Sequence, residues 1–117
     1  MSTLVLGREP VIEEWLERRR ALGQDKRDEV WEGVYHVAPP VLAQSGVVAG
    51  QLATQLYEPA RAAGLVPTLS FNLGSSDDLR VPDLGCHRPP VDYQLYMPTA
   101  ALVVEVPYPE AETFREQ

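Results

Sequence analysis

The chain has one cysteine, one lysine and no long apolar run. Because Cys86 is the only cysteine, an internal disulfide and a zinc site built from several cysteines are both excluded. No apolar stretch approaches the roughly 18 residues of a membrane-spanning helix. The start of the chain lacks the basic residues and the apolar length of a signal peptide. These absences favour a cytoplasmic protein with no membrane partner.

Basic charge is also scarce, since 10 basic residues face 17 acidic ones and the net charge is −7. Broad non-specific binding to nucleic acid usually needs a basic surface, so this balance argues against it. The longest basic run is Arg18-Arg19-Arg20. We expect this run to lie on the solvated face of a helix and to pair in part with Glu14 and Glu17.

The 117 residues suffice for one domain with a single modest core. A helix is predicted over 10–22, because Pro10 suits a first helical position and Gly23 a helix end. Residues 28–37 read as a β-hairpin around Glu32-Gly33. A second helix is predicted over 45–63 with Ser45 as its N-cap, and Pro59 is expected to kink or break its last turns.

Apolar runs over 65–73 and 79–85 predict two strands joined by a turn at 74–78. The proline-rich stretch 88–98 is expected to be a surface loop. Residues 100–106 are the most apolar run and predict a buried central strand. Residues 110–117 read as the start of a helix. This order predicts an α/β (α+β) domain with a mixed sheet.

Two carboxylates stand out against these apolar strands. Asp83 ends Arg80-Val81-Pro82-Asp83, and Glu105 lies inside Leu102-Val103-Val104-Glu105-Val106. A buried glutamate is costly unless it is hydrogen-bonded, bound to metal or protonated. Two carboxylates on neighbouring strands can share a hard divalent cation. Such a cation can polarise a phosphate and activate water, which is the basis of a metal-dependent phosphodiesterase.

Structural explanations compete with this one. Asp83 follows a proline at a strand boundary, where aspartate often caps or turns the chain. Glu105 could form a salt bridge with Arg80 or Arg88. By strand alternation, His36 is expected to be an exposed strand residue rather than a ligand.

Five segments in this order resemble the Uma-two family of endonucleases, within the restriction-endonuclease-like PD-(D/E)XK superfamily. They are Arg27-Asp28-Glu29-Val30-Trp31-Glu32-Gly33, Val37-Ala38-Pro39-Pro40, Phe71-Asn72-Leu73-Gly74, Arg80-Val81-Pro82-Asp83-Leu84 and Pro98-Thr99-Ala100-Ala101-Leu102-Val103-Val104-Glu105-Val106. The segments cover much of the chain, and their order and spacing carry the resemblance.

The resemblance implies a restriction-endonuclease-like mixed sheet flanked by helices, with residues 1–117 as a single, partial domain. It implies that Asp83 and Glu105 bind Mg²⁺ or Mn²⁺ and that the substrate is DNA, cut at a phosphodiester by metal-activated water. The backbone carbonyl of Val106 or Pro107 could complete the coordination. Because such folds often dimerise to cut two strands, a homodimer is expected.

The resemblance also implies an accessory acidic group on the early hairpin, which would be Glu29 or Glu32. The superfamily lysine, two positions after the glutamate, is replaced by Pro107. Uma-two relatives move this lysine into the following helix, where the matching residue is Glu116. The nearest cation is Arg115, whose guanidinium hardly ever deprotonates.

Two further departures bear on activity. Relatives commonly have a histidine at the start of the long helix, where this chain has Ser45. The family pattern also continues beyond Gln117, so the chain is expected to be shortened at its C-terminus, with open sheet edges that favour association.

Three interpretations stay open at this point. The first is a metal-dependent endonuclease. The second is a catalytically degenerate relative that serves as a binding or assembly module, since it lacks the lysine. The third is a portion of a longer enzyme whose lysine lies further along the gene.

Overall fold

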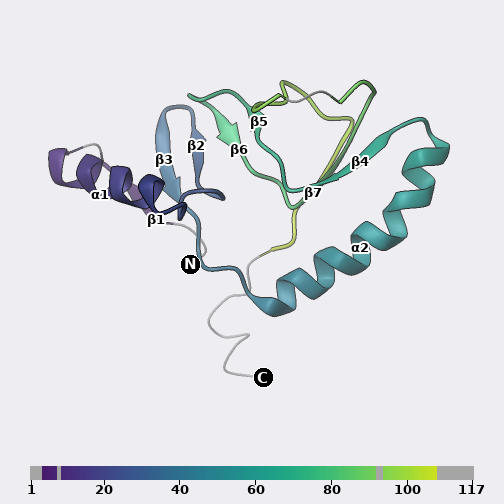
Figure 1. Ribbon diagram of the computed structural model, residues 1–117, viewed down its shortest axis with the longest axis horizontal. Coiled ribbons are helices and arrows are strands. Elements are labelled where there is room, and N and C mark those ends of the chain that lie inside the picture. Colours follow the sequence, from purple (N-terminus) through teal and green to yellow (C-terminus); the bar gives the residue numbers. More distant parts are fainter. Residues whose placement is uncertain (1–3, 8, 92–93, 108–117) are drawn as a thin grey trace.

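In the computed structural model, the described residues are 4–7, 9–91 and 94–107. They form two helices and eight strands, a mixed α+β arrangement (Figure 1). In chain order the elements are β1 (Leu4–Leu6), α1 (Pro10–Ala21), β2 (Glu29–Trp31), β3 (Val34–Val37), α2 (Ala43–Ala62), β4 (Val66–Leu69), β5 (Leu73–Gly74), β6 (Leu79–Arg80), β7 (Leu84–His87) and β8 (Leu102–Val104). The helix predicted over 110–117 lies outside the described residues.

The strands form two sheets rather than the single mixed sheet that the sequence led us to expect. The first sheet has the order β1-β3-β2-β6-β5 and the second has the order β4-β7-β8. All pairings between these strands are antiparallel. The parallel pairing found in the described part of the chain is an isolated bridge between Leu73 and Met97.

Each of two apolar runs contributes one strand to each sheet. The run 65–73 divides into β4 and β5, and the run 79–85 divides into β6 and β7. The second division falls at Val81-Pro82-Asp83, where Pro82 has no N–H to donate to a strand ladder. Sequence patterning detects the apolar runs, but it cannot show that the chain passes from one sheet to the other within them.

The prediction of a buried central strand over 100–106 was wrong. β8 pairs with β7, and within the described residues it forms one edge of the second sheet. Leu102 is 42% exposed and Val103 is 40% exposed. The buried central strand is β7, which contains the fully buried Leu84 and Cys86. An apolar run indicates burial only where another element covers both of its faces.

The hairpin was predicted correctly, but the exposure of His36 was not. Both turn residues have positive φ, 50° at Glu32 and 86° at Gly33, as a tight two-residue hairpin turn requires. His36 is only 6% exposed. Its ring stacks on Trp31, with centroids 3.6 Å apart. His36 pairs with Glu29, so Trp31 is its diagonal neighbour across the strands and covers it.

Both predicted helices are present. Helix α1 begins at Pro10 as expected. Helix α2 begins two residues earlier than predicted, and its N-cap is Leu42 without a side-chain cap, so Ser45 does not cap it. Pro59 lies inside α2 and does not break it. The carbonyl of Pro59 accepts a hydrogen bond from the N–H of Ala63 at 3.1 Å. Helical hydrogen bonding therefore continues past Pro59 to the end of α2 at Ala62.

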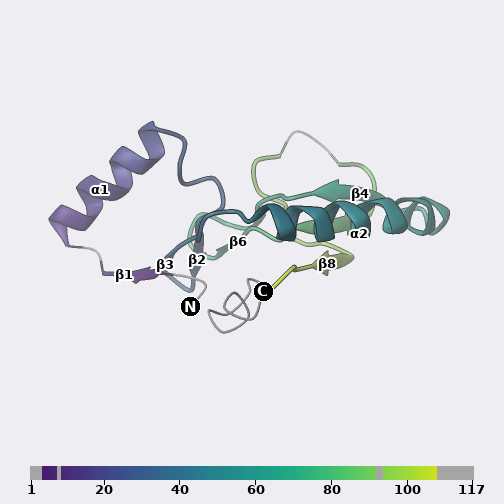
Figure 2. The same ribbon diagram turned by 90° about the horizontal axis from the view of Figure 1, so that it is seen from below.

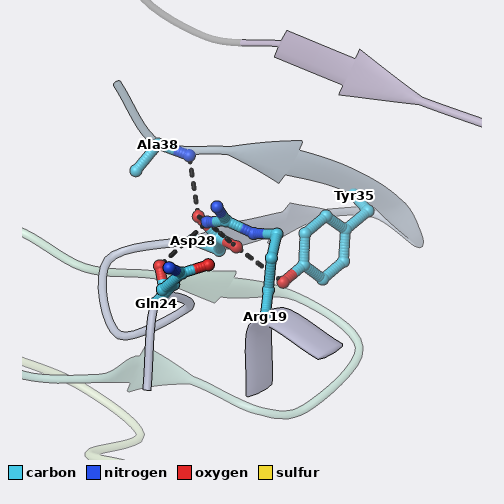
Figure 3. Close-up of polar contacts among 5 residues, drawn as sticks. All are labelled: Arg19, Gln24, Asp28, Tyr35 and Ala38. Carbon is cyan, nitrogen blue, oxygen red and sulfur yellow. Dashed lines mark hydrogen bonds and ion pairs between the residues drawn. The ribbon is translucent and has the colours of Figure 1, made fainter. Parts of the chain in front are cut away.

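A buried aspartate ties α1 to the hairpin (Figure 3). The carboxylate of Asp28, which is 4% exposed, accepts hydrogen bonds from Arg19 Nη2 at 2.9 and 3.0 Å, from the Tyr35 hydroxyl at 2.8 Å and from the Ala38 N–H at 2.8 Å. The same Arg19 nitrogen also donates to the Gln24 carbonyl at 2.9 Å. Burial and the bond to Asp28 raise the pKa of Tyr35. We call these five residues the Asp28 network.

The arginine run is therefore only partly a solvated face. Arg20 pairs with Glu17 at 2.6 Å on the exposed side of α1, as expected. Arg19, whose side chain is 15% exposed, faces inward and pairs with Asp28 instead. Consecutive helical residues point in different directions, so one arginine of a run can be buried beside two exposed ones.

The two helices lie at opposite ends of the molecule. Helix α2 runs along β4 and β7, while α1 lies beyond the first sheet (Figures 1 and 2). The radius of gyration is 15.9 Å, compared with about 13 Å for a tightly packed domain of this length. Helix α2 accordingly leaves apolar side chains such as Val47 and Tyr57 at least half exposed. No helix in the described segments is long and apolar enough to cross a membrane.

Two glycine-to-alanine changes should have opposite effects on stability. Gly74 has a φ of 112°, and a Cβ there would overlap the backbone carbonyl of Asp78. Gly74→Ala should therefore lower the free energy of unfolding by about 2–3 kcal/mol. Gly50 lies within α2 with open space around it, so Gly50→Ala should raise it by up to about 1 kcal/mol. Urea denaturation of both variants checks this, and equal effects would contradict it.

Candidate metal centre

Asp83 and Glu105 line one cavity of about 460 Å³. The first sheet, the segment leading into α2, the residues just before β7 and the residues just after β8 contribute to it. Asp83 lies between β6 and β7, and Glu105 directly follows β8. Glu29 reaches the same cavity from the start of β2. The structure thus brings together the two carboxylates singled out in the sequence and adds a third.

Asp83 is held by hydrogen bonds from distant parts of the chain. Arg27 Nη2 donates to its Oδ1 at 2.5 Å, and the N–H of Val106 donates to its Oδ2 at 2.8 Å. The preceding residues Val81 and Pro82 are buried and anchor the backbone on this side. Because these donors lie 56 and 23 residues away, Asp83 does not serve as a local turn or cap residue. Its side chain instead joins the segment before β2 to the segment that follows β8.

The environment of Glu105 disfavours its negative charge. Glu105 is exposed as a residue, yet its pKa is raised. The largest cause is loss of water around its carboxyl group, and the negative charges of Asp83 and Glu29 add to it. Arg27 and the backbone at Asp83 act in the opposite direction and do not cancel the rise. The site therefore carries an excess of negative charge that a cation would relieve.

The salt-bridge explanation for Glu105 is not what the described residues show. Arg80 donates to Asp78 at 2.9 Å and to the carbonyl of Val30 at 2.9 Å, so its guanidinium is engaged at the hairpin. Arg88 is exposed and forms no ion pair with Glu105 in the described part of the chain.

Replacing Glu105 with glutamine should change how stability depends on pH. Because the folded protein holds the Glu105 proton more tightly than the unfolded chain does, the contribution of Glu105 to stability falls as pH rises through its raised pKa. Glutamine has no such proton. The stability of Glu105→Gln relative to the parent should therefore increase with pH above the ordinary glutamate range and then level off. Urea titrations between about pH 4 and pH 8 test this, and a difference independent of pH would contradict it.

Of the two proposed accessory acids, the structure places only Glu29 in the cavity. Its Oε2 accepts the N–H of Val81 and its Oε1 accepts the indole N–H of Trp31, both at 2.7 Å. Glu32 is exposed at the hairpin turn, where its own N–H donates to Asp78 at 3.2 Å. Arg115 lies outside the described residues.

Three basic or aromatic side chains line the cavity although no functional role was predicted for them: Arg27, Trp31 and His36. His36 is buried, and its Nδ1 has no hydrogen-bond partner among the described residues. The sequence signals for Arg27 are its place two residues before Glu29 and its place at the start of the first segment of the resemblance. Its partner Asp83 is 56 residues away, a separation that local patterning does not reveal.

The donor atoms of the cavity suit a hard cation. Carboxylate oxygens of Asp83 and Glu105 are ligands that Mg²⁺ and Mn²⁺ prefer, and Val106 and Pro107 also line the cavity. The described residues contain no group of three or more His, Cys, Asp or Glu side chains placed to hold a metal ion. Mg²⁺ does not need one, because it is commonly held by one or two carboxylates together with water and substrate phosphates. The residues therefore fit Mg²⁺ better than a metal that needs a complete protein cage.

Comparisons with protein-family models, with curated proteins and with solved structures found no match to this chain. The resemblance to the Uma-two family accordingly stays a prediction from its motifs.

Proposed function

We propose that this protein is a metal-dependent endonuclease in which Asp83 and Glu105 bind one Mg²⁺ or Mn²⁺. The observation that carries the proposal is their convergence on one cavity from positions 22 residues apart in the chain. The pKa of Glu105 is raised, first by loss of water around its carboxyl group and then by the charge of Asp83. A restriction-endonuclease-like arrangement of the sheets and DNA as the substrate belong to the same proposal and rest on the motif resemblance.

Hydrolysis of a phosphodiester forms a new P–O bond from water and breaks the P–O bond to one sugar oxygen, which leaves with a proton that derives from the water. The bound cation would lower the pKa of that water and offset charge on the phosphate. The N–H of Val106 holds one oxygen of Asp83 in place, which supports the proposed role of Asp83 as a metal ligand. Glu29 holds the backbone of Val81, two residues before Asp83, and so supports its position.

Three observations favour a second function, a catalytically degenerate binding or assembly module. Arg27 already neutralises Asp83, and the superfamily lysine position is occupied by Pro107. Apolar side chains on α2 and β8 are also exposed, as at Val47 and Leu102. A module of this kind would fold and associate without needing a divalent ion, and a homodimer fits either function.

A plasmid-nicking assay distinguishes the two functions. The parent protein should convert supercoiled plasmid to the nicked form with Mn²⁺ or Mg²⁺, and EDTA should stop the reaction. Asp78→Asn provides a matched control, since Asp78 also pairs with an arginine, Arg80, but lies outside the cavity. The control variant should nick as the parent does. A folded parent without metal-dependent nicking would contradict the endonuclease and favour the module.

A further inference from the structure

Arg27 is the cation that faces the carboxylates of the proposed metal site. It pairs with Asp83 at 2.5 Å. Its positive charge also favours the negative form of Glu105. Three acids, Glu29, Asp83 and Glu105, line the cavity with it. Because Arg27 is the basic side chain among the charged residues of this lining, the charge balance of the site depends on where its guanidinium lies.

The Arg27 backbone is anchored while its side chain keeps freedom to move. The next residue, Asp28, is fixed by the Asp28 network. The Arg27 side chain is 39% exposed, and Asp83 is its one hydrogen-bond partner among the described residues. A guanidinium carries several N–H donors in a planar fork that matches a phosphate. Most of the donors on Arg27 are therefore available to a second anion.

We propose that Arg27 supplies the positive charge that contacts the phosphate of the nucleic acid at this site. While the site holds no divalent ion, Arg27 neutralises Asp83. When a divalent ion binds Asp83, Arg27 is released to the phosphate of the nucleic acid. This inference rests on the proposed metal-dependent function, and it assigns Arg27 as a substrate-binding residue that also competes with the metal for Asp83.

The proposal predicts opposite effects of one substitution on two ligands. Arg27→Met removes the charge that competes for Asp83, so Mn²⁺ should bind more tightly, by about tenfold for one charge at this range and exposure. The same change removes a phosphate contact, so DNA should bind more weakly in the presence of Mn²⁺. Arg27→Lys keeps the charge. Its Mn²⁺ affinity should therefore equal that of the parent, and its DNA affinity should lie between those of Arg27→Met and the parent.

The experiment uses calorimetry with Mn²⁺ alone and fluorescence anisotropy with a labelled DNA duplex, with Mn²⁺ or with EDTA. The variants are Arg27→Met, Arg27→Lys and the control Arg20→Met, which removes the same charge from the exposed surface of α1. Thermal unfolding of each variant checks that it is folded. A residue with only a structural role would weaken both ligands together, so the opposite signs are specific to the proposed role.

Tighter Mn²⁺ and weaker DNA binding in Arg27→Met, with neither change in Arg20→Met, would support the proposal. If the parent binds Mn²⁺ through Asp83 but Arg27→Met binds it no more tightly, the role of Arg27 is wrong and the metal site stands. If a folded parent binds no Mn²⁺, the proposed function itself is overturned, and the role of Arg27 with it.

Discussion

Asp28→Ala is expected to lower the free energy of unfolding by about 3–5 kcal/mol, the usual cost of removing one partner from a buried ion pair. The substitution leaves the guanidinium of Arg19, a side chain that is only 15% exposed, without its carboxylate partner. It also removes the acceptor for Tyr35 and for the Ala38 N–H. For a chain of this length, the melting temperature should fall by about 10 °C or more.

A second substitution separates the charge effect from the loss of hydrogen bonds. Arg19→Met in the Asp28→Ala background removes the uncompensated charge and should recover part of the lost stability. Differential scanning calorimetry of the parent, the two single variants and the double variant gives the coupling between these residues. A melting temperature for Asp28→Ala equal to that of the parent would show that the Asp28 network contributes little.

Asp83→Asn is expected to reduce the rate of plasmid nicking about hundredfold or more. A bound cation supplies several kcal/mol of transition-state stabilisation, and each 1.4 kcal/mol corresponds to about a tenfold change in rate. Glu105→Gln should have an effect of similar size, because in the proposed site both carboxylates hold the same ion. The initial rate of nicking at saturating Mn²⁺ measures both effects.

The double variant Asp83→Asn/Glu105→Gln tests whether the two residues act as a unit. Once one ligand is lost and the cation no longer binds, loss of the other should have little further effect. The double variant should therefore retain about the same residual rate as either single variant. Losses that multiply would mean that the two carboxylates act independently and do not share an ion.

The sequence predicted local elements well because their signals are local. Pro10 and Gly23 bound a helix that is present, and Glu32-Gly33 forms the hairpin turn with positive φ. The sequence also singled out Asp83 and Glu105, and both line one cavity. Part of the reason was wrong, because Glu105 is exposed and follows an edge strand instead of lying in a buried one.

What the sequence did not predict depends on contacts across long separations. The pairing of Arg27 with Asp83 spans 56 residues. The inward-facing Arg19 could not be told from its two neighbours in the arginine run. The exposure of Leu102 depends on whether another element covers β8, which an apolar run does not state.

Calorimetric titration of Mn²⁺ into the folded protein is the most direct test of the metal centre. A cation site shared by Asp83 and Glu105 predicts binding of about one Mn²⁺ per chain in the parent and in the Asp78→Asn control. It predicts loss of binding in Asp83→Asn and in Glu105→Gln. Absence of binding in a folded parent, or binding that survives both substitutions in the cavity, would contradict it.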